Sequence, residues 1–194
     1  MAKLIFRYGA MNCGKTTNLL QVAHNYEEKG LKVIIIKSSK DKKGDNNIVS
    51  RLGVERCVDI LLNENDSIKL DLNNLDCILV DEAQFLEPFQ VKQLWIIAKL
   101  YDIPVICYGL KTTFKGEFFK GSKPLMELSD SLEELVTICA CGKKARFNVR
   151  LVNNEIVKDG KEVAIDGFDN VTYEPMCGKC YIEKVLEIKK QEDM

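Results

Sequence analysis

Eight residues near the start of the chain have the types and spacing of a phosphate-binding loop. The stretch GAMNCGKT runs from Gly9 to Thr16 and satisfies the pattern G-x-x-x-x-G-K-[ST]. Glycines let the backbone curl so that successive amide hydrogens point at phosphate oxygens, and the following helix adds its positive N-terminal end. In this pattern Lys15 reaches the β- and γ-phosphates, and the hydroxyl of Thr16 ligates magnesium. The alternative, an ordinary glycine-rich turn, is disfavoured by the strand expected before it and the helix expected after it.

Two adjacent acids follow a buried apolar run. Asp81 and Glu82 stand where the run CILV ends, and the carboxyl ends of strands collect ligands in open α/β sheets. Because neighbouring side chains of a strand point to opposite faces, we expect Asp81 to turn toward the magnesium beside Thr16 and Glu82 to face a different space. A carboxylate in that space can accept a proton from an attacking hydroxyl. The alternative is two solvated acids at a strand end.

The chain has one histidine, and its position argues against a catalytic role. His24 lies nine residues beyond Lys15, which is about 13 Å along the axis of the helix expected there at roughly 1.5 Å per residue. We expect it on the helix surface. Glu82 is then the best general base that the sequence offers.

Four of the eight cysteines form two close pairs, Cys139 with Cys141 and Cys177 with Cys180. Four thiolates are the number that closes a tetrahedral structural zinc site, which has no open position for catalysis. The second pair has the C-x-x-C spacing of a zinc knuckle, and the first pair is the tighter C-x-C. We therefore expect a structural zinc ion that fixes the base of the loop at residues 142–176. Four free thiols are the alternative.

Strand and helix patterns alternate over the first part of the chain. Strands are expected at residues 4–8, 31–36, 76–81 and 104–110, and helices from about Lys15 to Lys29 and from Pro88 onward. This alternation predicts a parallel sheet covered by helices on both faces. The sequence thus predicts an α/β core with a phosphate-binding loop over residues 1–135.

The pattern changes after about Ser131. Short strands, a tight cysteine turn and a hairpin are followed by a loop at residues 158–176, rich in Gly, Asp and Asn, and by a short helix over residues 181–190. These features predict a second, smaller lobe over residues 136–194.

Composition narrows the classes of protein. The 194 residues carry a formal net charge of -1 and are 46% apolar, which predicts a proper core and argues against a surface built to hold nucleic acid. No apolar run reaches membrane-spanning length, and the chain leads at once into a strand pattern without a signal peptide. We expect a cytoplasmic protein that binds neither a membrane nor nucleic acid.

Taken together, GAMNCGKT, LVDEAQF, YGLKTTFKGEFF, the two cysteine pairs and the loop between them resemble the type II thymidine kinase family. The resemblance covers the chain from Leu4 to about Tyr181. It implies a RecA-like P-loop NTPase core, a small zinc-ribbon-like lobe with a lasso loop, and transfer of the γ-phosphoryl group of ATP to the 5′-hydroxyl of thymidine. It also implies Mg²⁺ with ATP, a structural Zn²⁺, a homotetramer and feedback inhibition by thymidine triphosphate.

The resemblance also implies roles for individual residues, with Glu82 as the proton acceptor and Thr16 and Asp81 at the magnesium ion. On the ATP side it implies Gly9, Ala10, Met11, Asn12, Cys13, Gly14, Lys15, Thr16, Asp81, Glu82, Ala83 and Gln84. On the thymidine side it implies Met11, Asp41, Phe85, Leu110, Phe114, Ile165, Gly167 and Tyr173. In such a lasso the base is held mostly through backbone hydrogen bonds.

The chain departs from the family pattern at three places. The first cysteine pair is C-x-C where C-x-x-C is common. The usual Ile-Gly-Gly of the lasso reads Ile165-Asp166-Gly167, and Lys43 stands where an arginine is common.

Two other classes of protein share single features with this sequence. The stretch VDEAQ is similar to the acid box of helicase-like ATPases, and a small module held together by zinc could bind nucleic acid. Helicase-like motors need a second lobe for which the chain after residue 135 is too short, and the near-neutral charge disfavours the module.

Overall fold

A six-stranded parallel sheet forms the centre of the larger lobe. The computed structural model describes residues 1–41, 46–50, 53–160 and 170–188, and its sheet has the strand order β5-β2-β6-β7-β1-β8. These strands are β1 (Leu4–Tyr8), β2 (Val33–Ser38), β5 (Ile60–Leu62), β6 (Cys77–Asp81), β7 (Val105–Gly109) and β8 (Ser131–Glu134). Each neighbouring pair runs parallel. The central strands β6 and β7 are buried along their whole length, as expected for a parallel sheet with both faces covered.

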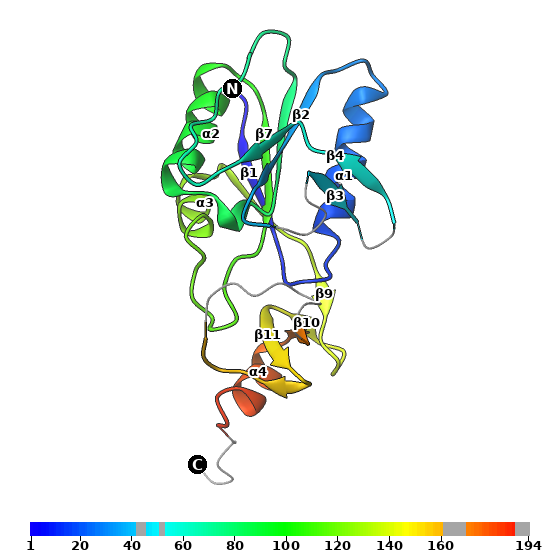
Figure 1. Ribbon diagram of the computed structural model, residues 1–194, viewed down its shortest axis with the longest axis vertical. Coiled ribbons are helices and arrows are strands. Elements are labelled where there is room, and N and C mark those ends of the chain that lie inside the picture. Colours follow the sequence, from blue (N-terminus) through cyan, green and yellow to red (C-terminus); the bar gives the residue numbers. More distant parts are fainter. Residues whose placement is uncertain (42–45, 51–52, 161–169, 189–194) are drawn as a thin grey trace.

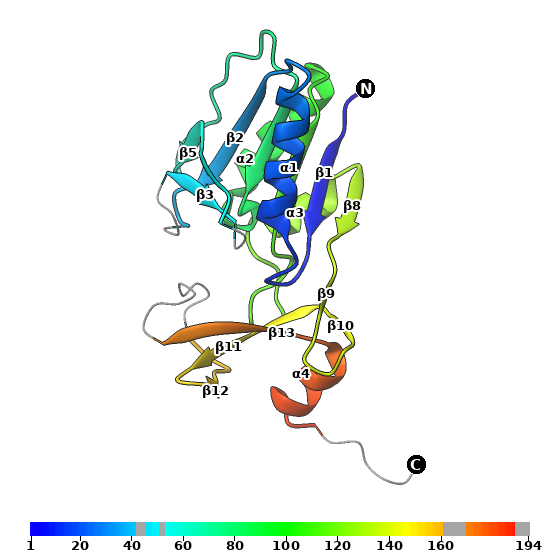
Figure 2. The same cartoon turned by 90° about the vertical axis from the view of Figure 1, so that its right-hand side faces the viewer.

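Helices cover both faces of this sheet. Helix α1 (Lys15–Glu27) lies on one face, and α2 (Pro88–Leu100) and α3 (Ser122–Leu128) lie on the other (Figures 1 and 2). Each face has its own apolar cluster, one that includes Leu19 of α1 and one that includes Leu94 of α2. A short 3₁₀ turn, η1 (Ala83–Phe85), links β6 to α2. The predicted doubly covered α/β architecture is therefore confirmed.

Helices α1 and α2 begin where the sequence places them. Helix α1 starts at Lys15, directly after the loop, and ends at Glu27, two residues earlier than expected. Helix α2 starts at Pro88, where Glu87 and Gln90 form a capping box that satisfies the first backbone amides. An antiparallel pair, β3 (Asn47–Val49) and β4 (Glu55–Cys57), lies beside α1 (Figure 1). In the described part of the chain no helix is long and apolar enough to cross a membrane.

The smaller lobe lies at one end of the core, below it in Figures 1 and 2. Its elements are β9 (Thr137–Ile138), β10 (Lys144–Ala145), β11 (Phe147–Val152), β12 (Glu155–Ile156), β13 (Val171–Met176) and α4 (Gly178–Lys184). Strands β9 and β10 form a hairpin, and β11 lies between β12 and β13 in a three-stranded antiparallel sheet.

Two sequence expectations for this lobe are wrong. The segment expected as a loop at residues 158–176 ends in strand β13, which pairs with β11 over six residues. The signal that this strand gives is weak because Pro175 and Glu174 interrupt its apolar alternation. The last helix begins at Gly178, three residues before the expected start, because the Cys177 side chain accepts a hydrogen bond from the Cys180 amide and caps it.

Candidate active site

The loop after β1 closes around the ammonium group of Lys15. Gly14 adopts the left-handed conformation, φ 80°, which favours glycine and lets α1 start directly afterwards. Lys15 Nζ donates to the Ala10 carbonyl at 3.0 Å and lies 3.6 Å from the Cys13 sulfur. The loop therefore places a buried positive charge at the N-terminal end of α1, where the backbone already favours anions.

Thr16 brings the loop into contact with the first acid of the pair. Its Oγ1 lies 3.4 Å from Asp81 Oδ2 at the end of β6. A hydroxyl and a carboxylate side by side are the hard oxygen ligands that Mg²⁺ prefers. The predicted donor pair is thus brought together from the start of α1 and the end of β6, which are far apart in the sequence, and it fits a magnesium ion.

The pKa values of both acids, Asp81 and Glu82, are raised by their surroundings. Burial, together with the charge of Glu82, raises the pKa of Asp81 to about 7. Burial and the charge of Asp41 raise the pKa of Glu82 as well, and Lys15 acts in the opposite direction on both. A buried cluster of carboxylates is stabilised by cations, so this end of the sheet is suited to a phosphate group that arrives with a divalent metal.

Glu82 is held in an uncommon backbone conformation. Its φ is 49° in the left-handed region, which non-glycine residues seldom adopt. Its Oε2 accepts a hydrogen bond from Gln84 Nε2 at 2.5 Å, and Gln84 Oε1 in turn accepts from the Leu110 amide at 3.0 Å. The carboxylate of Glu82 is therefore held by a buried amide that bridges β6 and β7.

A cavity of about 630 Å³ opens between the loop, Glu82 and the residue that follows β7. It is lined by Met11, Asn12, Cys13, Gly14, Lys15, Thr16, Thr17, Asn18, Gln21, Val49, Glu82, Leu110 and Leu135. Its volume is in the range of small-molecule sites. Most of the predicted ATP-side residues, together with Met11 and Leu110 from the predicted thymidine side, thus share one cavity.

A second, smaller cavity contradicts the expectation that Asp81 and Glu82 face separate spaces. Asp41, Asp81 and Glu82 all line it, so the two acids of the pair do not face separate spaces as expected. The alternation rule holds within a strand, but Glu82 lies beyond the last residue of β6 and turns with its left-handed backbone. Glu82 consequently borders both cavities, while Lys37 forms an ion pair with Asp41 at 3.1 Å.

The three aromatic residues expected on the thymidine side do not share one environment. Phe114 and Tyr173 both contact the guanidinium group of Arg150. Phe85 packs edge to face against Phe119, with ring centroids 5.8 Å apart, and does not line the 630 Å³ cavity. Two further expected thymidine-side residues, Ile165 and Gly167, lie outside the described residues, as do Asp166 and Lys43.

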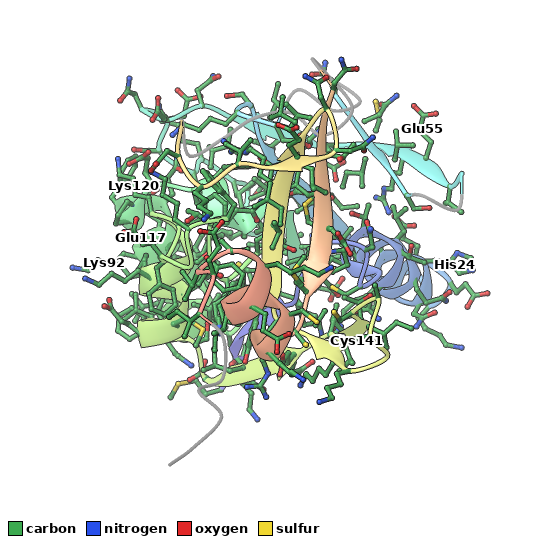
Figure 3. The ribbon with its side chains drawn as sticks, turned by 90° about the horizontal axis from the view of Figure 1, so that it is seen from below. His24, Glu55, Lys92, Glu117, Lys120 and Cys141 are labelled. Atoms are coloured by element: carbon green, nitrogen blue, oxygen red, sulfur yellow. The ribbon has the colours of Figure 1, made fainter. Side chains whose placement is uncertain are left out.

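The four paired cysteines come together in the small lobe. Their sulfur atoms all lie within 4.8 Å of one another, and four ligands at a Zn–S distance of about 2.3 Å would place sulfurs about 3.8 Å apart. Hydrogen bonds from the Cys141 and Cys177 backbone lower the pKa of Cys139 to about 6, and a backbone hydrogen bond from Cys180 lowers the pKa of Cys177. Hydrogen bonds with Cys141 and Cys177 instead raise the pKa of Cys180 to about 12, so the fit to zinc rests on the convergence of the four sulfurs, which would bind the metal as thiolates. Figure 3 labels Cys141, one of these four cysteines, in the small lobe.

His24 lies away from these groups. Its side chain is 64% exposed and pairs with Glu28 on the next turn of α1, and Figure 3 shows it at the outer side of the molecule. The predicted surface position is confirmed.

Two residues that the sequence analysis did not single out connect the lobes. Asn148 of β11 is buried, and its Oδ1 accepts a hydrogen bond from the Met11 amide of the phosphate loop at 2.7 Å. Arg150, two residues further along the same strand, is also buried. Polar residues at alternate positions of a strand are a signal that could have indicated a buried polar face.

The fold and the site define a P-loop α/β protein with an attached four-cysteine lobe. The family model described as thymidine kinase matches residues 2–181. The thymidine kinase of Shewanella oneidensis is 44% identical over 194 residues, covering 96% of this chain and 100% of that protein. That of Chromobacterium violaceum is 44% identical over 93% of this chain and 98% of its own, and that of Pasteurella multocida is 43% identical over 95% and 99%. The chain belongs to the thymidine kinase family.

Among solved structures, the Pif1 helicase from Candida albicans aligns with 69% of this chain and 36% of its own, at 12% identity and a TM-score of 0.38. This similarity is too weak to bear on fold or function.

Proposed function

We propose that this member of the thymidine kinase family transfers the γ-phosphoryl group of ATP to the 5′-hydroxyl of thymidine, with Glu82 as the general base. The observation that carries the proposal is the convergence of four side chains at one end of the sheet. Lys15 and Glu82 line the same cavity, and Thr16 Oγ1 lies 3.4 Å from Asp81 Oδ2. Phosphoryl transfer needs these groups together, because positioning and charge stabilisation account for most of its catalysis.

The phosphate loop would bind and orient the nucleotide. Amides of Gly9 to Thr16, with the segment Asp81 to Gln84, form the ATP side, and the Lys15 ammonium would contact the β- and γ-phosphates. Its present partners are loop carbonyls, which it can exchange for phosphate oxygens by side-chain rotation. The positive charge then faces the oxygens on which negative charge develops.

Glu82 would take the proton of the attacking hydroxyl. Gln84 holds its carboxylate at 2.5 Å, which leaves the other carboxylate oxygen to face the hydroxyl. Burial raises the pKa of Glu82, and a raised pKa makes a carboxylate a stronger base. Thr16 and Asp81 would hold Mg²⁺, which supplies neutralisation of phosphate charge when it is bound.

The nucleoside would bind between the core and the small lobe. We assign to it Met11, Asp41, Leu110 and the aromatic residues Phe85, Phe114 and Tyr173, with Ile165 and Gly167 of the lasso. The contact of Asn148 with the Met11 amide supports this arrangement because it ties the loop to the lobe. We also propose that residues 1–135 form the ATP-binding unit, and that residues 136–194 form the unit that covers the nucleoside and excludes water.

One zinc ion would be held in the small lobe with no coordination position open for catalysis. Its ligands would be Cys139, Cys141, Cys177 and Cys180.

Membership of the family also supports a cytoplasmic homotetramer that is inhibited by thymidine triphosphate. A triphosphate of the product nucleoside could occupy the nucleoside site and the phosphate loop at once, and it would compete with both substrates. Sedimentation of the purified protein, and inhibition kinetics against ATP and thymidine, test these two points.

A phosphoryl-transfer assay tests the proposed reaction. The full chain is incubated with Mg²⁺ and γ-labelled ATP together with a panel of nucleosides, and label should appear in thymidine monophosphate. Transfer to a different nucleoside only would refute the assignment of thymidine. ATP hydrolysis that needs an oligonucleotide, without transfer to any nucleoside, would indicate a helicase-like ATPase instead.

A further inference from the structure

The inner face of β11 carries a buried arginine to which the reaction described above assigns no task. Arg150 is only 4% exposed and stands opposite Tyr173 in the register of β11 and β13. Burial of a charged group is unfavourable unless its surroundings compensate. The groups that surround this guanidinium therefore indicate what it does.

Two aromatic side chains from different lobes contact Arg150. Its Cζ lies 3.9 Å from the centroid of the Phe114 ring, a residue of the core segment that follows β7. Its Nε donates to the Tyr173 hydroxyl of β13 at 2.9 Å, and the Tyr173 ring centroid is 5.4 Å from Cζ. A cation stacked on a ring is held more strongly when it is shielded from water. One side chain thus sets the position of two rings that belong to separate lobes.

The surroundings leave the guanidinium little freedom. The Phe114 carbonyl accepts a hydrogen bond from the Tyr181 hydroxyl of α4 at 3.1 Å, so the backbone beneath the stacked ring is also tied to the small lobe. A Cβ built on Gly160 would lie 3.7 Å from Arg150 Nη1, so this backbone is also close to the guanidinium group. Gly160 itself has a φ of 125°, a conformation open almost only to glycine. Arg150 is therefore held between Phe114 of the core and Tyr173 of its own lobe, with Gly160 close by.

We propose that Arg150 is a positioning residue for the nucleoside. It holds the ring plane of Phe114 and the hydroxyl direction of Tyr173 in the arrangement that the base needs. This inference rests on the proposed function, in which both aromatics border thymidine. The task requires arginine rather than lysine, because a planar guanidinium stacks on a ring and points its Nε–H in a fixed direction, whereas an ammonium is a flexible point charge.

Steady-state kinetics of the full zinc-loaded chain test the proposal. Both Arg150→Met and Arg150→Lys should raise KM for thymidine by about tenfold or more while KM for ATP changes less than about twofold, since each variant loses the planar stack. Arg150→Lys should not rescue the defect, although it keeps the charge. A wild-type KM for thymidine in either variant would overturn the proposal.

Lys115 offers a matched control on the same ring. Its Nζ lies 5.8 Å from the Phe114 centroid, and its side chain is 37% exposed and pairs with exposed Asp159 at 3.6 Å. Lys115→Met removes a cation beside the same ring, but one that water screens, so KM for thymidine should stay within about twofold of wild type. An equal rise in both Lys115→Met and Arg150→Met would show that any nearby cation suffices and would refute the positioning role.

A double-mutant cycle separates positioning from general loss of structure. Tyr173→Phe keeps the ring but removes the acceptor of the Arg150 Nε–H, so it should raise KM for thymidine to a smaller degree. In the double variant Arg150→Met/Tyr173→Phe the two effects should be less than multiplicative, because they break the same contact. Fully multiplicative effects would overturn the proposal. Should Arg150→Met fail to retain zinc or fold, Arg150→Lys and Tyr173→Phe provide the same cycle.

The failure of this inference differs from the failure of the proposed function. A wild-type chain that does not phosphorylate thymidine would refute the proposed function. A wild-type chain that phosphorylates thymidine, with an unchanged KM in the Arg150 variants, would refute only the positioning role.

Discussion

Glu82 combines a left-handed backbone with a carboxylate that Gln84 holds at 2.5 Å. A non-glycine residue in this region costs about 1–3 kcal/mol, and such strain is concentrated at functional sites. The strain moves the carboxylate out of the alternation of β6, so that it borders both cavities beside the phosphate loop. This placement suits the proposed role of general base, in which the carboxylate would reach a hydroxyl of the nucleoside while the loop holds the phosphates.

Glu82→Gln should lower turnover by about 100-fold or more, because glutamine keeps the size of the side chain but cannot take a proton. Binding of ATP and of thymidine should stay largely intact, since the backbone and the contact partners remain. Turnover in single-turnover assays, and affinities by calorimetry, measure the two effects separately. Near-normal turnover in the pure variant would remove Glu82 from the mechanism.

Lys15→Ala should reduce turnover and ATP affinity together. In the proposed reaction the ammonium contacts phosphate in the ground state and in the transition state, so its loss should affect both. Lys92→Ala is a suitable control because Lys92 is exposed on α2, at the outer side of the molecule (Figure 3). Titration with ATP and initial rates measure the effect. Unchanged binding and rate in Lys15→Ala would contradict the assignment of the phosphate loop.

At the scale of elements, the site depends on how closely the end of β7 approaches η1. A Cβ added at Gly109, the last residue of β7, would lie 2.7 Å from Gln84 Oε1 and 3.1 Å from the Gln84 backbone nitrogen. Both distances are too short for ordinary contact. Glycine at this position is therefore what lets the buried Gln84 side chain bridge from Leu110 to Glu82.

Gly109→Ala should lower kcat by roughly tenfold, because displacement of Gln84 would release the carboxylate of Glu82, the proposed base, and misplacement of a catalytic group is costly. ATP affinity should change much less, since the loop amides are not moved directly. Gly178→Ala is the control, because a Cβ there would meet Phe147 at an ordinary 3.8 Å. The prediction is wrong if kcat of the two variants is the same.

Strand β11 is the second element on which the site depends. Asn148 and Arg150 project from one face of it, and they contact Met11 of the phosphate loop and Phe114 of the core. Both contacts link the small lobe to the core through buried polar groups, which are strongly directional. A shift of β11 by one residue would turn both side chains to the other face, so the register with β13 is part of the site.

At the scale of the whole molecule, the two lobes depend on different sources of stability. The core has two apolar clusters, one on each face of a six-stranded sheet. In the described residues, the apolar cluster of the small lobe includes Cys139 and Cys177, and Cys180 packs against it. Small domains with limited cores commonly rely on metal ions or disulfides, so metal binding should act mainly on the small lobe.

Cys177→Ser should loosen the small lobe and raise the KM for thymidine far more than the KM for ATP, because the free energy of metal binding is folding free energy of the lobe that it closes. Wild-type protein should contain one zinc ion per chain, with the four thiols protected from alkylation. Cys57→Ser is the control, since Cys57 is exposed on β4, outside the cluster. An active enzyme without zinc and with four reactive thiols would contradict the prediction. Loss of ATP binding with thymidine binding retained would reverse the assignment of the two lobes.

Much of this protein could be predicted from the sequence because the relevant signals are local. The loop from Gly9 to Thr16, the acid pair and the two cysteine pairs are recognised by spacing over a few residues, and the alternating apolar runs predict the doubly covered sheet. Within such short segments the backbone itself determines which groups lie side by side.

Only the tertiary structure decided which distant groups meet. The Met11 amide and Asn148 Oδ1 are 137 residues apart in sequence and 2.7 Å apart in space, and Arg150 reaches Phe114 across the boundary between the lobes. Strand β13 has a weak pattern of its own and forms because β11 offers six residues of backbone to pair with. Such contacts depend on strand register and on the packing of one lobe against another, and these are properties of the folded chain that no local spacing records.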